Sequence, residues 1–253
     1  MLGEGEPIAD RVAGAAARTA AAGTARLSAA SGPGRTVPEA GDRFCEGVAD
    51  FPARRARVSQ MLIPERMQAQ LAESLARREE DARAFREINQ RREMIYDGAN
   101  AYIRVAGHWT SFSLGDSSGP RGLNDPLWPL DALWGARSDA VEIAQEEVRD
   151  VATTRCRLTV DLTQADAALP AGVSVPAGPY RALTRKPAEV WLDAAGLARR
   201  IAVSGFDKAA PGKQIWAIVE LWGFGVAVDV IPPSPDEIVP PHEAFRDMQP
   251  PGT

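Results

Sequence analysis

The chain has 253 residues and a formal net charge of −5 at pH 7, with 45% apolar and 25% charged residues. This length suits one large domain with its own core, and we expect a single domain over residues 1–253. The acidic balance argues against a nucleic-acid partner, because phosphate binding requires a basic surface. Since no run of 18 apolar residues occurs, no transmembrane helix is predicted.

The N-terminal region predicts a helix and then a strand. Residues 7–22 are rich in alanine and carry a weak apolar face, and Gly23 is a typical residue after a helix end. Apolar and polar residues alternate over 24–29, which is typical of a strand. The Gly- and Pro-containing stretch 31–42 predicts a loop.

A hairpin and a long helix follow. Residues 44–50 and 54–62 read as two strands around a turn at 51–53, and the second strand alternates between a polar and an apolar face. Residues 64–92 are rich in good helix formers and begin with a proline. We expect an amphipathic helix that lies on the sheet or over its mouth; the alternative is a helix that binds a protein partner.

From residue 93 the pattern returns to strands. Asp97-Gly98 lies between the runs 94–96 and 101–105, which is a strong hairpin signal, and a further strand is expected at 109–114. Residues 129–134 predict one or two helical turns.

The remaining segments alternate between strands, short helical turns and loops. We expect strands within 140–162, at 190–192, 199–203, 213–219 and 225–231, a helical turn at 164–169, a loop at 170–187, and a proline-rich extended tail at 232–253. The total of about ten or eleven short strands, with the main sheet over 93–231, indicates an α+β fold built on a large curved antiparallel sheet. A sheet of this width must curl or close.

Several of these segments resemble the actinobacterial LolA/LppX-like lipoprotein family over about residues 8–240. The similar segments are Asp97-Gly98 with Tyr102 and Trp109, Val148–Thr154 with Val160-Asp161-Leu162, Pro187, Val190–Asp193, Gly196-Leu197, Arg199-Arg200, and Leu221, Phe224-Gly225, Val228, Val230, Pro232-Pro233 and Asp236–Ile238. The resemblance implies a half-barrel sheet wrapped over a helix, with a cavity for an apolar ligand and no catalytic residues. In the sequence as printed we expect neither the signal peptide nor the lipid-modified cysteine of such lipoproteins, and we expect the helix at 64–92 to be an addition to the family pattern.

The aromatic residues give the candidate binding site. Six of them fall within forty residues: Tyr96, Tyr102, Trp109, Phe112, Trp128 and Trp134. They read either as sheet core or as the lining of a pocket for a large apolar ligand. Tyrosine hydroxyl groups would then orient a polar end of that ligand.

The sequence offers few groups for catalysis. Tyr96, Tyr102 and His108 are the only candidates for a catalytic role, and each also has an ordinary structural interpretation. Cys45 and Cys156 are interpreted as buried reduced thiols. No metal site and no cofactor are expected, because metal-ligand spacings and a phosphate-binding glycine loop are both missing from the sequence.

Two functions remain open at this stage. The first is a carrier or binding protein for a lipid-like or polyketide-like molecule. The second is a cyclase-type enzyme of natural-product biosynthesis, which would fold a long apolar substrate and promote ring formation by orientation. We expect a cytoplasmic protein from the sequence as printed, and a protein of the cell envelope if a signal peptide precedes it.

Overall fold

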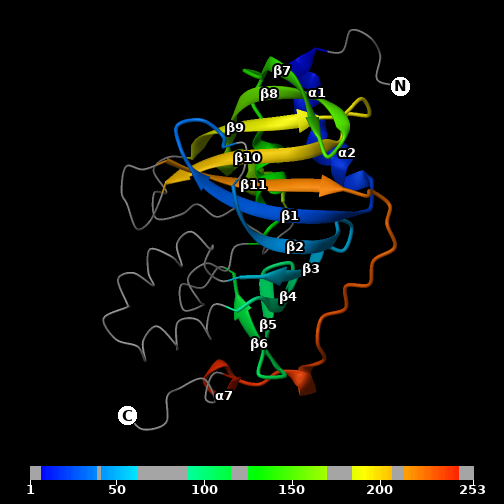
Figure 1. Cartoon of the computed structure of the whole chain (residues 1–253), viewed down its shortest axis with the longest axis vertical. Helices are drawn as coiled ribbons and strands as arrows, with labels where there is room; N and C mark the ends of the chain where they lie inside the picture. Colours follow the sequence, from blue (N-terminus) through cyan, green and yellow to red (C-terminus); the bar gives the residue numbers. More distant parts are fainter. Residues whose placement is uncertain are drawn as a thin grey trace.

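The computed structural model describes residues 7–38, 41–61, 90–114, 125–169, 184–206 and 214–244. These residues form one open antiparallel sheet of eleven strands (Figure 1). The strands are β1 (Thr24–Pro33), β2 (Asp42–Asp50), β3 (Arg55–Gln60), β4 (Arg92–Asp97), β5 (Asn100–Val105), β6 (His108–Ser113), β7 (Val141–Val148), β8 (Val151–Asp161), β9 (Arg185–Leu192), β10 (Ala198–Phe206) and β11 (Gln214–Trp222).

The sheet consists of two meanders that meet at one seam. Its order is β6-β5-β4-β3-β2-β1-β11-β10-β9-β8-β7, so every pair except β1 with β11 joins strands that follow each other in sequence. Figure 1 shows the strands fanning from β7 at one end of the molecule to β6 at the other, with β1 near the middle. The expected α+β fold with a large curved antiparallel sheet is therefore confirmed.

Short helices fill the concave face of the sheet. They are α1 (Ile8–Ala13), α2 (Ala15–Ala21), α5 (Trp128–Ala132), the 3-10 turn η1 (Leu133–Gly135) and α6 (Leu162–Ala168). The α5–η1 segment belongs to the connection from β6 at one sheet edge to β7 at the other edge. Its Leu130, Ala132 and Leu133 are buried in the main apolar core together with side chains from the inner face.

The hairpin turns follow from local sequence. Gly98 has φ +59°, and Ala106 and Gly107 have φ +48° and +89°, so the β4–β5 and β5–β6 turns both use the left-handed region. The β3 residues alternate between buried and more exposed positions, as the sequence predicts, with Ala56, Val58 and Gln60 inward.

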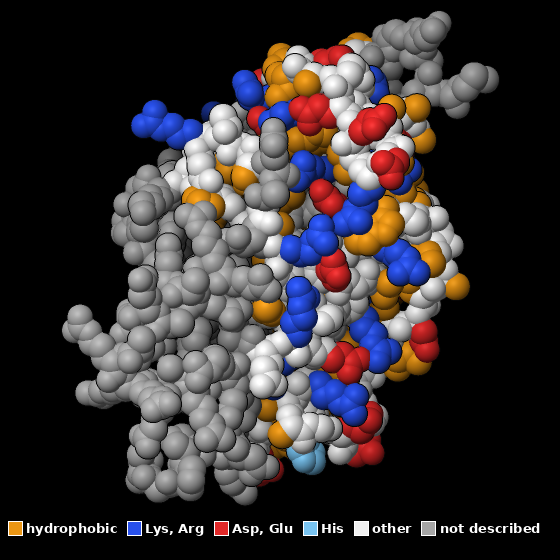
Figure 2. Space-filling view, viewed as in Figure 1, with side chains coloured by type: hydrophobic (Ala, Val, Ile, Leu, Met, Phe, Trp, Pro, Cys, Tyr) orange, Lys and Arg blue, Asp and Glu red, His pale blue; other side chains and the backbone are white. Residues whose placement is uncertain are grey.

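The outer face is covered by charged side chains (Figure 2). Trp191 is 1% exposed, its indole N–H donates to Glu146 Oε2 at 2.8 Å, and the guanidinium groups of Arg155 and Arg200 lie 4.9 Å and 5.2 Å from its ring. Arg155 also donates to Glu189 at 2.7 Å. Stacking of arginine on tryptophan lets ion pairs cover apolar surface, so Trp191 is covered by residues of the outer face itself.

The C-terminal segment returns to the edge of the sheet. A strand was expected at 225–231, and that prediction is wrong: this stretch forms no strand and pairs with none of the strands that the structure describes. Gly223 and Gly225, at φ +59° and +76°, turn the chain out of the sheet after β11, where β1 and β10 already occupy both sides. The chain then contacts the edge strand β6, where Val239 N–H donates to Trp109 O at 2.8 Å. The 3-10 turn η2 (Pro235–Glu237) and α7 (Pro241–Ala244) lie in this segment.

Other boundaries differ from expectation. The helix expected at 7–22 is interrupted at Gly14, the helical turn expected at 164–169 begins two residues earlier, and three strands precede the predicted main sheet of 93–231. Most of the expected helix at 64–92 lies outside the described residues, and Arg92 at its end already belongs to β4. Its role as a lid or as a partner-binding helix stays a prediction.

Candidate functional site

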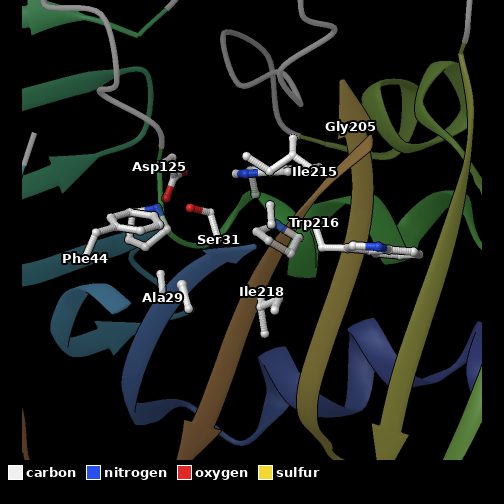
Figure 3. Close-up of a pocket in the computed structure, with 13 residues that line it drawn as sticks. Ala29, Ser31, Phe44, Asp125, Gly205, Ile215, Trp216 and Ile218 are labelled. Atoms are coloured by element: carbon white, nitrogen blue, oxygen red, sulfur yellow. The ribbon is translucent and has the colours of Figure 1, made fainter. Parts of the chain in front are cut away.

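A pocket of about 180 Å³ lies on the concave side of the sheet (Figure 3). Residues of β1, β10 and β11 form its floor, Phe44 of β2 forms one side, and the segment that leads into α5 covers it. Its apolar lining includes Ala29, Phe44, Trp128, Pro129, Ile215 and Ala217. This wall has the composition of a small-molecule site, which is mostly apolar with a few polar groups.

A β-bulge positions Phe44 at the pocket. Ala29 pairs with Cys45 and Ala30 pairs with Arg43, so Phe44 is an extra residue in β2 that has no partner in β1. A bulge of this kind re-aims the side chains beside it. Phe44 is thereby directed to the concave side, where it packs against the main core.

One polar group of the lining belongs to a buried cluster of charges. Asp125 lines the pocket, and its Oδ1 accepts from Leu127 N–H at 2.8 Å. Arg54, in the turn between β2 and β3, donates from Nη1 to Asp131 Oδ1 at 2.6 Å, from Nη2 to Asp131 Oδ2, and from Nη2 to Asp125 Oδ2 at 3.3 Å. We call Arg54, Asp125 and Asp131 the buried triad.

The buried triad contains two carboxyl groups and one cation. Burial raises the pKa of Asp131 to about 7, although Arg54 opposes the rise, and burial likewise raises the pKa of Asp125. Two acids that share one cation titrate as a pair, and burial opposes the ionisation of both. Asp131 takes both terminal nitrogens of Arg54 and is the better stabilised carboxylate, so Asp125 is the one that takes up a proton more readily.

A second polar group lies on the inner face nearby. The Tyr96 hydroxyl donates to Gln60 Oε1 at 2.8 Å, and both side chains are buried. Burial raises the pKa of Tyr96 well above its usual range, and the neighbouring Cys45 and Asp125 add to the rise. Gln60 Nε2 has no hydrogen-bond partner among the described residues.

The structure separates the six aromatic residues that sequence reasoning grouped. Tyr96 and Phe112 face the concave core, and Trp128 is the one of the six that lines the pocket. Tyr102 and Trp109 point to the opposite face, because Tyr102 pairs with Ile95 and Ser111 and Trp109 pairs with Arg104.

Trp134 is 39% exposed and lies outside the pocket lining. His108 is exposed too, and it is the first residue of β6.

Sequence reasoning missed the polar part of the site. Asp125 directly before a proline and a helical segment is a recognisable helix-start signal. No sequence signal connects it to Arg54, which is 71 residues away along the chain.

The residues that the structure describes contain no group of three His, Cys, Asp or Glu side chains that could hold a metal ion. Among them there is also no helix of the length and apolarity that crossing a membrane requires.

Comparison with solved structures finds proteins of similar architecture. The chain is similar to lipoprotein LppX from Mycobacterium tuberculosis, with 11% identity and a TM-score of 0.48 over 88% of this chain and 99% of that one. It is similar to LprF from Mycobacterium bovis, with 11% identity and a TM-score of 0.49 over 90% and 97% of the two chains. A LolA superfamily protein from Nitrosomonas europaea is 7% identical, with a TM-score of 0.27 over 91% and 96%.

In sequence, no protein-family model and no curated protein matches the chain.

Proposed function

We propose that this protein binds an apolar small molecule in the pocket between the concave face of the sheet and the segment that leads into α5. The observation that carries the proposal is the pocket itself, whose wall of aliphatic and aromatic side chains is interrupted by Asp125. The outer face supports it at Trp191, because Arg155, Glu146 and Glu189 already cover that ring.

The size of the pocket limits the ligand. At about 180 Å³ it is smaller than the roughly 300–1,000 Å³ of sites for drug-sized ligands. It therefore suits one short alkyl segment or one ring of a larger molecule, and we propose that it holds the end of a lipid-like ligand.

The candidate catalytic residues lend no support to the cyclase alternative. The hydroxyl of Tyr96 is hydrogen-bonded to Gln60, whereas Tyr102 and His108 lie away from the pocket lining. A carrier or binding role requires no reactive group, so we favour it.

Filling the pocket tests the proposal. Ala217 lines the pocket from β11, so Ala217→Leu places three more carbon atoms in the cavity. Titration with the fluorescent apolar probe N-phenyl-1-naphthylamine should show a dissociation constant at least about tenfold weaker than that of the wild type, equivalent to about 1.4 kcal/mol.

Ala152→Leu is the matched control, because Ala152 is exposed on β8. This variant should bind the probe within about twofold of the wild type, and melting curves establish that both variants are folded. If the wild type takes up no probe, or if Ala217→Leu binds it as tightly as Ala152→Leu does, the pocket is not the binding site.

A further inference from the structure

The polar side chains at one end of the pocket are those of Asp125 and Ser31. Figure 3 shows the carboxyl group of Asp125 pointing toward the hydroxyl group of Ser31 at one end of the apolar lining. Among the lining residues that the structure describes, Asp125 is the one with an ionisable side chain. A ligand that fills the apolar part would therefore place its polar group beside a carboxyl group.

The guanidinium group of Arg54 is hydrogen-bonded to both carboxyl groups of the buried triad. Both of its terminal nitrogens donate to Asp131, and one of them also donates to Asp125. Its side chain is 18% exposed, and the remaining donor, Nε, is buried and has no hydrogen-bond partner among the residues that the structure describes. An anionic ligand would have to displace one of these carboxyl groups to gain a cation.

We propose that the pocket selects neutral apolar molecules that carry an ester, ketone or hydroxyl oxygen beside Asp125, and discriminates against free carboxylates. The inference rests on the proposed function and adds the chemical class of the ligand. A protonated Asp125 can donate one hydrogen bond to a carbonyl oxygen or accept one from a hydroxyl group. A ligand carboxylate in the same place would be a third acid beside Arg54, so its charge would stay unpaired in a dry site.

Any apolar pocket prefers neutral ligands, so the contribution of Asp125 must be separated from ordinary desolvation. Methyl octanoate and octanoate share a chain and differ mainly in one charge. At neutral pH, competition of each against N-phenyl-1-naphthylamine gives a ratio of dissociation constants, and we expect octanoate to bind at least about tenfold more weakly to the wild type.

Asp125→Asn isolates the effect of the carboxyl group. The asparagine oxygen can still accept from Leu127 N–H, so the local turn is retained. We expect the ratio between the two ligands to fall to within about threefold in this variant, which corresponds to less than 1 kcal/mol.

Asp193→Asn is the control. Asp193 is also buried and bonded to an arginine, and it accepts from the backbone N–H groups of Ala195 and Leu197. It lies in the β9–β10 turn, at the opposite end of β10 from the pocket residue Gly205. This variant should keep the wild-type ratio.

Three results would overturn the inference. Octanoate that binds the wild type as tightly as methyl octanoate does, or more tightly, would mean that Arg54 captures the anion; this measurement needs no variant. A ratio unchanged in Asp125→Asn would assign the discrimination to desolvation alone. Absence of probe uptake by the wild type would remove the proposed function and this inference with it, whereas uptake without discrimination would leave the proposed function intact.

Discussion

Replacing Arg54 by methionine would leave two buried carboxyl groups without their cation. The side chains of Asp125 and Asp131 are 12% and 5% exposed, so neither can gain full hydration in the folded protein. Leaving a buried charge without its partner costs about 3–5 kcal/mol. We expect the loss of stability in Arg54→Met to depend on pH, because a carboxyl group can escape this cost by taking up a proton.

The cost of that proton sets the expected magnitude. Holding a carboxyl group of ordinary pKa 3.9 in its protonated form costs about 1.5 kcal/mol at pH 5 and about 5.6 kcal/mol at pH 8, at 1.36 kcal/mol per unit. At pH 5 taking up a proton costs less than leaving a buried charge unpaired, so Arg54→Met should lower the free energy of unfolding by no more than about 1.5 kcal/mol. At pH 8 taking up a proton no longer costs less, and the free energy of unfolding should fall by about 3–5 kcal/mol.

The wild type should show a weaker trend of the same sign. Burial raises the pKa of Asp131 to about 7. Between about pH 4 and pH 7 the folded protein therefore binds more protons at this pair than the unfolded chain does. The contribution of the pair to stability is largest at the acidic end of this window and is lost as the pH rises through it.

Urea unfolding, followed by tryptophan fluorescence at about pH 5 and about pH 8, measures these differences. Adding Asp131→Asn to Arg54→Met removes one of the two acids and should recover part of the loss at the higher pH. If Arg54→Met loses the same free energy at both pH values, the carboxyl groups are not buried as a pair and the reasoning is refuted.

Two further predictions concern close packing and the thiols. Gly47→Ala should destabilise the protein by at least about 2 kcal/mol in urea unfolding, because its Cβ would lie 2.1 Å from the carbonyl oxygen of Arg57. Gly205→Ala is the control. Its Cβ would meet nothing closer than 3.7 Å, so this variant should be nearly as stable as the wild type. Burial raises the pKa of both Cys45 and Cys156, the latter to about 11. Neither thiol should therefore react with iodoacetamide at neutral pH until urea unfolds the chain. Detection of alkylated cysteine in the folded protein by mass spectrometry would contradict this prediction.

The hairpins were predictable because their signals are local. A strand pair such as β4–β5 is specified by alternation on each side of a turn at Gly98, all within a few residues. The stretch 225–231 shows the limit of that logic. Its residues do alternate between less and more exposed positions, yet no sheet edge is free beside β11. A sequence pattern describes one strand, whereas pairing also requires a vacant neighbour.

The candidate site was predictable only in part, for a related reason. Clustering along the chain suggested that Tyr96, Tyr102 and Trp109 share a face, but the register of β4–β5 and β5–β6 places Tyr96 inward and the other two outward. Alternation reverses the face of a side chain with each residue, so aromatic density cannot show which rings meet. Arg54 and Asp131 are 77 residues apart, and only the path of the chain across the concave face unites them.

The seam between β1 and β11 has a consequence for how the protein is made. The N-terminal meander can form from neighbouring hairpins as the chain leaves the ribosome, but the free side of β1 must wait for β11, almost 200 residues later. Until then β1 presents an unpaired edge running from Thr24 to Pro33 in the middle of the future sheet. During synthesis this nascent edge is the part of the fold that most needs protection from pairing with another chain.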